Sequence, residues 1–249
     1  LDRLTDAVAA GTISVDGAGA YSVAVSNAAG TTESAAAVVL PDDPSIALKP
    51  FTIPNTTAAG VFPDLRAWNP EPAGASGIVT VGADGPVQVG GQRIRFFGVD
   101  LTSNKNFPTH AGAELHAQRL ARFGFNSVRF HWADSFWPYY TEEPGSLIIK
   151  DSATSRRFDE NARDRLHYFM ARCADVGIYA NVNLLVARTF QEGDGLGAEI
   201  DSMPWARQHL LSFFNDRMVE LQKEYAAWLL ASPNPYRDNR SLAQDPAVA

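Results

Sequence analysis

The stretch Gly124-Phe125-Asn126-Ser127-Val128-Arg129-Phe130-His131 decides the fold class of this chain. Val128 and Phe130 alternate with Arg129 and His131, and successive side chains of a β-strand point to opposite faces. The apolar pair is therefore expected to face a core and the polar pair to face the other way. A strand covered on both faces is usually apolar throughout. The polar pair therefore indicates that this face of the strand has a functional role.

Strands and helices alternate on both sides of this stretch. Helices are predicted over residues 109–123, 158–176 and 214–228, and further strands over 93–101 and 178–185. In the second helix the apolar residues recur every three or four positions, which is the spacing of one helix face. The alternating order predicts an α/β fold with a parallel sheet covered by helices.

Each of the three strands carries polar residues near its carboxyl end. The first ends in Asp100, the second carries Arg129 and His131, and the third carries Asn181 and Asn183. The active site lies at this end of the strands in a (β/α)8 barrel and also in a doubly wound sheet. The nucleotide-binding form of the doubly wound sheet is not favoured, because no G-x-G-x-x-G pattern follows the first strand.

Three segments resemble the first three strands of glycoside hydrolase family 5, whose members are (β/α)8 retaining glycosidases that include cellulases and mannanases. They are Phe97-Gly98-Val99-Asp100-Leu101, residues 124–130 and residues 177–184, and residues 245–249 are similar to the run into the fourth strand. A complete barrel needs about 250 residues, and only about 170 follow the proline-rich segment described below. The resemblance therefore implies a partial (β/α)8 TIM barrel of about three βα units.

The resemblance also implies where the catalytic groups lie. In this family the acid/base Glu follows an Asn on strand four and the nucleophile Glu lies on strand seven. Both are then expected after Ala249, so no catalytic residue is assigned within the chain. Arg129 resembles the strand-two Arg that braces the nucleophile carboxylate and keeps it ionised. A structural Arg paired with a buried acid is the alternative for Arg129.

Four further polar residues are candidates for substrate binding or support of the active site. His131 either binds substrate or is a satisfied core histidine. Asn183 and Asn181 are expected to bond sugar hydroxyls or the neighbouring catalytic carboxyls. Asp100 occupies the polar position of strand one, or it caps its own loop.

Aromatic residues crowd the loop after the second strand, and Trp132 and Trp137 are the candidates among them. Aromatic rings stack on the C–H faces of pyranose rings, so these residues fit a sugar platform. The alternative is a small core that anchors the loop. Other members of the group are Phe136, Tyr139 and Tyr140.

The amino-terminal part of the chain has a different character. Alternating runs on either side of the turn Asn27-Ala28-Ala29-Gly30 predict an antiparallel hairpin, and they resemble the last two strands of a bacterial immunoglobulin-like sandwich. Residues 1–40 are therefore assigned to the end of such a domain, 41–75 to a proline-rich linker, and 76–249 to the barrel portion. A second hairpin at 78–89 is expected to plug the bottom of the barrel.

Composition excludes several classes of partner. The net charge of -7 and the pI near 5.2 argue against nucleic acid and anionic membranes. No apolar run approaches the roughly 20 residues that a membrane span needs. Cys173 is the single cysteine, so a disulfide framework and a multi-cysteine metal site are excluded, and no metal or cofactor is expected.

Two classes of function follow from these features. The first is a retaining glycoside hydrolase that cleaves O-glycosidic bonds in a polysaccharide or oligosaccharide. The expected linkage is β, and the expected location is outside the cell or at the cell surface. The second is a non-catalytic carbohydrate-binding or adhesion protein built from a degenerate barrel and the immunoglobulin-like module. An Asn-Glu pair in the sequence just past Ala249 would favour the enzyme. The sequence leaves the oligomeric state open.

Overall fold

The computed structural model describes residues 19–22, 24–27, 30–33, 37–39, 52–69, 71–83, 85–135, 144–149 and 153–249. The chain divides into two compact units, Leu1–Thr52 and Ile53–Ala249. The candidate site residues all belong to the second unit.

The described residues of the first unit form two antiparallel strand pairs. β1 (Gly19–Tyr21) pairs with β4 (Ala37–Val39), and β2 (Ala24–Asn27) pairs with β3 (Gly30–Glu33). Asn27 lies opposite Gly30, which confirms the antiparallel hairpin predicted around this turn. The immunoglobulin-like assignment of these strands stays a prediction.

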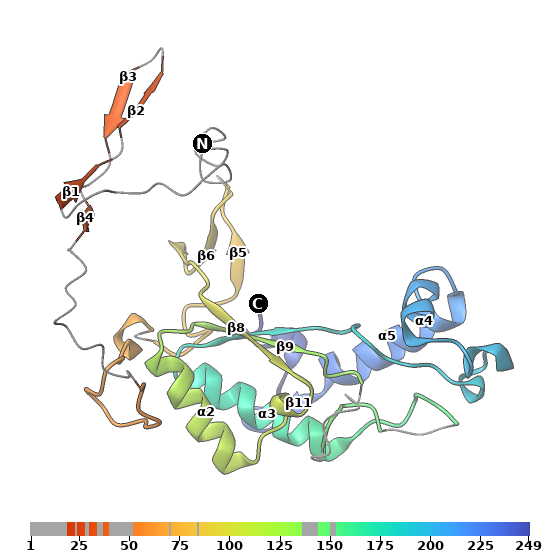
Figure 1. Ribbon diagram of the computed structural model, residues 1–249. Coiled ribbons are helices and arrows are strands. Elements are labelled where there is room, and N and C mark those ends of the chain that lie inside the picture. The colour runs from red at the N-terminus through yellow and green to blue at the C-terminus, as the bar shows by residue number, and fades with distance from the viewer. Residues whose placement is uncertain are drawn as a thin grey trace. The chain divides into compact units, whose positions relative to one another are not determined.

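The second unit begins with short elements and continues as alternating strands and helices (Figure 1). Its strands are β5 (Val79–Val81), β6 (Val87–Val89), β7 (Gln92–Arg93), β8 (Gly98–Thr102), β9 (Ser127–His131), β10 (Tyr179–Val182), β11 (Pro233–Asn234) and β12 (Arg240–Ser241). Its α-helices are α2 (His110–Arg122), α3 (Glu160–Asp175), α4 (Trp205–Leu211) and α5 (Asp216–Ala231). Short 3-10 helices cover Arg66–Trp68, Ser103–Asn106, Glu192–Asp194, Ala198–Ile200 and Leu242–Gln244.

The predicted parallel sheet is confirmed. β8, β9 and β10 are neighbours in chain order and run parallel. Val248 forms a parallel bridge with Ala180 of β10, supported by hydrogen bonds from Ala180 N to Ala247 O and from Ala249 N to Ala180 O, both 2.8 Å long. The fourth segment thus lies beside the third strand. In the common doubly wound sheets the strand order reverses within the first four strands, which differs from this sequential order.

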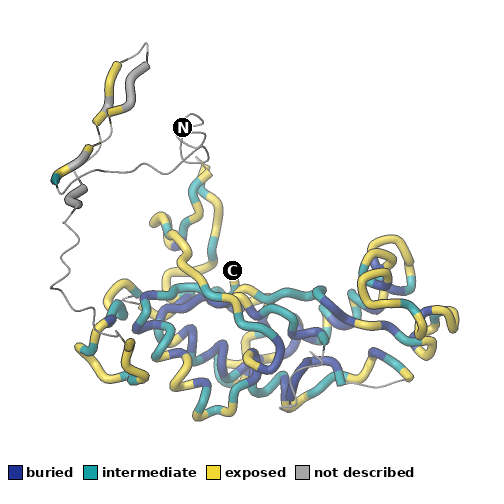
Figure 2. Tube along the Cα trace, in the orientation of Figure 1, coloured by how far each residue is buried: buried dark blue, intermediate teal, exposed yellow. Residues whose placement is uncertain are grey.

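Helices α2 and α3 lie side by side against one face of the sheet, and the β5–β6 hairpin rises from the other (Figure 1). Val128, Phe130, Leu166 and Phe169 are fully buried in the core between sheet and helices. Figure 2 shows the buried residues concentrated in this layer. As predicted, Thr109 caps α2, its side chain accepting a hydrogen bond from Gly112 N.

The first strand is shorter than the predicted 93–101. The side chain of Asn126 hydrogen-bonds the backbone just before β8: its Oδ1 accepts from Phe97 N, and its Nδ2 donates to Arg95 O. Regular strand pairing therefore starts only at Gly98. The predicted helix over 214–228 is confirmed as α5, whereas α4 was not predicted.

Residues 53–75 of the predicted linker pack on the strands and helices of the second unit. Residues 53–75 lie in the same compact unit as the strands and helices that follow. Arg122 is fully buried, and its guanidinium donates to the backbone carbonyls of Pro54, Thr56, Val61, Phe62 and Pro63. Residues 53–75 are therefore not the free extended chain that their proline content suggested, because this buried cation needs their carbonyls. The division at residues 40 and 75 otherwise stays a prediction.

The β5–β6 hairpin lies at the amino-terminal end of the sheet. Val79, Val89 and Ile94 pack in one cluster with Tyr179, the first residue of β10. This matches the position expected for the hairpin ahead of strand one. Val81 at the tip of β5 is 72% exposed.

Candidate functional site at the carboxyl ends of the strands

Polar side chains form a row across the three parallel strands. Asp100 of β8 lies opposite Arg129 of β9, which lies opposite Asn181 of β10. Residues in register share a face, so the predicted convergence of these three residues is confirmed. Arg129 Nε lies 3.9 Å from Asp100 Oδ1, and both side chains are about half exposed. Such an open ion pair contributes only about 0.2–1 kcal/mol.

A closer contact joins Arg129 to His131 and Asn183, the polar residues nearest the carboxyl ends of β9 and β10. Asn183 follows β10 by one position, and its Oδ1 accepts a 2.6 Å hydrogen bond from Arg129 Nε. His131 Nδ1 lies 3.0 Å from the same oxygen. Arg129, His131 and Asn183 therefore meet at one amide oxygen. Asn181 stands apart from this contact, since its Nδ2 donates to Ala249 O at 3.4 Å.

The aromatic candidates are only partly within the described residues. Trp132 follows β9 directly and adopts φ +54, a left-handed conformation that non-glycine residues rarely take. Its ring lies 6.2 Å from that of His131 and 6.0 Å from that of Trp205. Trp205, at the start of α4, was missed by the sequence reasoning. Trp137 lies outside the described residues, as do Phe136, Tyr139 and Tyr140.

A buried carboxylate ties the loops after β9 and β10 together. Asp134 is 1% exposed and accepts hydrogen bonds from the backbone N–H groups of Val186, Ala187 and Arg188. Burial raises the pKa of Asp134, and the three N–H donors act against that shift. Asp134 thus fixes the loops that frame the site, and sequence reasoning did not identify this residue.

Arg188 and Asp194, in the loop after β10, have structural roles. The Arg188 guanidinium donates to Ser155 and to Leu221 O and lies 5.0 Å from the centroid of Phe190. Burial lowers the pKa of Arg188. Asp194 accepts hydrogen bonds from the N–H and the hydroxyl of the same Ser155. This network holds the long loop against the segment before α3.

The segment beside β10 is held by an ion pair. Arg237 donates two 2.8 Å hydrogen bonds to the carboxylate of Asp245, which is 6% exposed, and Ala247 N donates to the same group. Burial alone would raise the pKa of Asp245, but these donors outweigh it, so the pKa lies below the ordinary value. The pair positions Val248 to extend the sheet.

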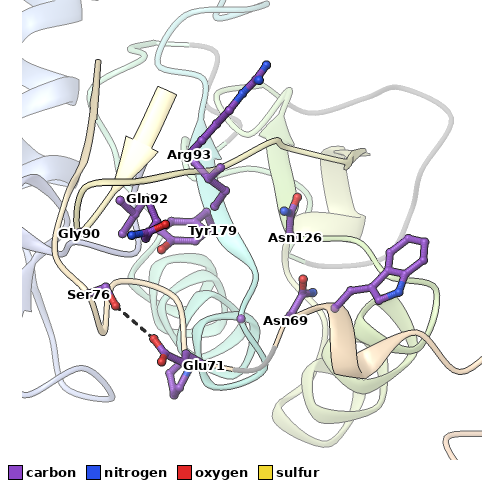
Figure 3. Close-up of a pocket in the computed structure, with 13 residues that line it drawn as sticks. Asn69, Glu71, Ser76, Gly90, Gln92, Arg93, Asn126 and Tyr179 are labelled. Atoms are coloured by element: carbon purple, nitrogen blue, oxygen red, sulfur yellow. Dashed lines mark hydrogen bonds between the residues drawn. The ribbon is translucent and has the colours of Figure 1, made fainter. Parts of the chain in front are cut away.

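Two cavities of the second unit lie beside the sheet, and only the second of them includes Arg129 in its wall. One, of about 400 Å³, opens at the amino-terminal ends of the strands between residues 68–76 and the β6–β7 turn (Figure 3). Glu71 there accepts a 3.1 Å hydrogen bond from Ser76. The other, of about 600 Å³, lies between the β5–β6 hairpin and the open face of the sheet, where Arg129 and Asn181 form part of its wall.

The described residues contain no group of three or more His, Cys, Asp or Glu side chains placed to hold a metal ion. No helix in the described part of the chain has the length and apolar character to cross a membrane. Cys173 is fully buried on α3, where burial raises the pKa of its thiol.

Fold and site together define an α/β protein whose polar residues gather at the carboxyl ends of sequential parallel strands. The structure is similar to the endo-1,4-beta-mannanase from Rhizomucor miehei, with a TM-score of 0.52 and 17% identity. That match covers 69% of this chain and 46% of the mannanase. At this identity the similarity shows the fold alone: the described α/β unit is similar in fold to part of that mannanase.

Two more enzymes are similar at lower TM-scores. A glycoside hydrolase family 5 mannosidase from Rhizomucor miehei has a TM-score of 0.49 and 16% identity, covering 69% of this chain and 46% of the enzyme. The endo-beta-1,4-mannanase from Thermotoga petrophila has a TM-score of 0.42 and 19% identity, covering 64% and 34%. This chain thus spans less than half the length of these enzymes. No protein-family model and no curated protein matches the sequence.

Proposed function

We propose that residues 76–249 are the amino-terminal part of a (β/α)8 retaining glycoside hydrolase that cleaves β-linked polysaccharide. One observation carries the proposal: Asp100, Arg129, His131 and Asn183 converge at the carboxyl ends of β8–β10, with a fourth parallel segment beside β10. Active sites of (β/α)8 barrels are built at this end. The similarity in fold to mannanases suggests β-mannan as the first substrate to test.

In this proposal Arg129 holds a catalytic carboxylate in its ionised form. Its Nε is engaged by Asn183, and a guanidinium carries four further N–H donors on its two terminal nitrogens. A carboxylate next to a fixed guanidinium has a lowered pKa. Retaining hydrolysis uses two carboxylates about 5–5.5 Å apart, and both are proposed to come from residues beyond Ala249.

The aromatic pair Trp132 and Trp205 supplies a surface for a sugar ring beside the polar contact. The two rings lie 6.0 Å apart, and Trp205 is 48% exposed. Aromatic faces suit the C–H faces of pyranoses. Because an enzyme of this kind encounters its polysaccharide substrate outside the cell, we also propose an extracellular or cell-surface location.

The experiment compares the present chain with the same chain extended through the coding sequence that follows Ala249. We expect the extended protein to hydrolyse β-mannan and the present chain to be inactive, since it lacks the proposed carboxylates. In the extended protein, Arg129→Lys should lower kcat by about one to two orders of magnitude, because lysine keeps the charge but loses the planar fork.

Arg156→Lys is the matched control. Arg156 is as exposed as Arg129 and pairs with Glu224 away from the strand ends, so its replacement should leave kcat unchanged. An extended protein that binds mannan without hydrolysing it would favour the non-catalytic carbohydrate-binding alternative. Turnover by the present chain would show that the catalytic groups have been misassigned.

A further inference from the structure

The contact at Asn183 fixes the orientation of its amide group. The Nε of Arg129 always carries a proton and can only donate, and it lies 2.6 Å from Asn183 Oδ1. With the amide turned over, an N–H would face an N–H at this distance. Asn amides are otherwise ambiguous in orientation, but the cation next to this one leaves a single choice. The oxygen of Asn183 therefore faces Arg129.

The same oxygen then determines the protonation of His131. His131 Nδ1 lies 3.0 Å from Asn183 Oδ1, and a carbonyl oxygen only accepts hydrogen bonds. Nδ1 must therefore carry the proton. In a neutral imidazole the other ring nitrogen is then an acceptor. No hydrogen bond from a described residue reaches His131 Nε2.

We propose that Asn183 is a positioning residue that holds His131 in its Nδ1-protonated tautomer, so that Nε2 accepts a hydrogen bond from a saccharide hydroxyl group. The inference rests on the proposed function, because the saccharide is the substrate proposed there. It adds that His131 accepts and the saccharide hydroxyl donates in this hydrogen bond, which the proposed function alone does not define.

The arrangement of donors and acceptors fits a saccharide. Arg129 and the Nδ2 of Asn183 can only donate, whereas Nε2 of His131 and the carboxylate of Asp100 accept. A sugar hydroxyl both donates and accepts, so neighbouring hydroxyls are best recognised by a mixed set. His131 is the last residue of β9, and its ring lies 6.2 Å from that of Trp132. The acceptor thus stands between the polar row and the proposed stacking surface.

The tautomer can be read directly from the imidazole nitrogens of the ¹⁵N-labelled chain. At about pH 8, above the ordinary titration range of imidazole, two-bond ¹H–¹⁵N correlations distinguish protonated from unprotonated ring nitrogens. We expect His131 to show a protonated Nδ1 and an unprotonated Nε2. The reverse pattern in the native chain would overturn the proposal.

Variants of Asn183 test the cause. Asn183→Leu removes the acceptor and should shift His131 to the Nε2-protonated form that free imidazole favours. Asn183→Asp keeps an acceptor and should keep the native tautomer. His116, on α2, should give the same pattern in every variant, which shows that the variants are folded. An unchanged His131 in Asn183→Leu would mean that Asn183 does not set the tautomer.

Titration with a β-1,4-manno-oligosaccharide separates this inference from the proposed function. If the saccharide shifts both His131 Nε2 and Arg129 Nε, the recognition role is supported. If it shifts Arg129 Nε but not His131 Nε2, the role of His131 is refuted while the proposed function stands. If neither resonance moves although the tautomer is as expected, the proposed substrate class is refuted and the positioning role of Asn183 stands.

Discussion

Burial of His167 should make the stability of the second unit depend on pH. This side chain lies on α3, is 2% exposed, and its Nε2 is bonded to no described residue. Burial, assisted by the charge of Arg163, lowers the pKa of His167 from 6.5 to about 4, while Asp164 acts in the opposite direction. The folded unit therefore holds a neutral imidazole under conditions in which the unfolded chain binds a proton.

The sign and the size follow from proton linkage. Between about pH 6.5 and pH 4 the unfolded state binds more protons than the folded state, so the free energy of unfolding falls as the pH falls. The complete loss is about 3 kcal/mol, since each unit of pKa difference corresponds to roughly 1.4 kcal/mol. At about pH 5 the loss amounts to about 2 kcal/mol relative to neutral pH.

Urea unfolding followed by tryptophan fluorescence measures this effect. All tryptophans lie in the second unit, so the signal reports that unit alone. Between about pH 7.5 and pH 5 the native chain should lose about 2 kcal/mol more than His167→Gln, which has no titrating group. His116→Gln is the control, because the side chain of His116 on α2 is exposed to solvent, whereas that of His167 is buried. Equal losses in the native chain and His167→Gln would refute the reasoning.

Two further predictions concern contacts that hold the start of the second unit. Gly177 has φ +81, and a Cβ there would lie 2.6 Å from Asn69 Cβ, whereas Gly91 has φ +76 and open space around it. Gly177→Ala should therefore reduce the free energy of unfolding by at least about 1 kcal/mol more than Gly91→Ala. Equal urea midpoints for the two variants would contradict this prediction. Arg122→Lys should lower stability by about 2–4 kcal/mol and speed thermolysin cleavage of the segment whose carbonyls Arg122 binds. Arg119→Lys is its control on the same helix, because the guanidinium of Arg119 lies at the same 5.8 Å from the Phe123 ring, and equal cleavage rates for the two variants would show that the carbonyl contacts contribute little.

The strands and helices of the second unit could be predicted because their signals are local. The alternation of Val128 and Phe130 with Arg129 and His131 spans only four residues, and it correctly separated the buried face from the polar face. Thr109 was likewise recognisable as a cap, because its partner Gly112 lies three residues away. Periodicity and capping act over a few residues, so they can be read from a single sequence.

The contacts that sequence reasoning missed join distant parts of the chain. The carbonyls that Arg122 binds lie 59 to 68 residues earlier, and Asp134 accepts from N–H groups 52 to 54 residues later. Local sequence gives no measure of which backbone groups a buried charge will meet. Proline content correctly indicated that the described residues 52–69 and 71–75 form no α-helix, but not that a buried cation would bind their carbonyls.

The candidate site lies between these two cases. Each polar residue was predicted from its own strand, but their contact depends on the register between strands. Because Asn181 lies opposite Arg129, Asn183 is brought level with His131, and a shift of one residue would turn the Asn183 side chain to the other face of the sheet. Arg129 lies opposite Asn181, and its long side chain extends to Asn183, two residues further along the chain. Register therefore decides whether these residues share one amide oxygen, and that shared oxygen is what fixes the donors and acceptors that the site presents to a ligand.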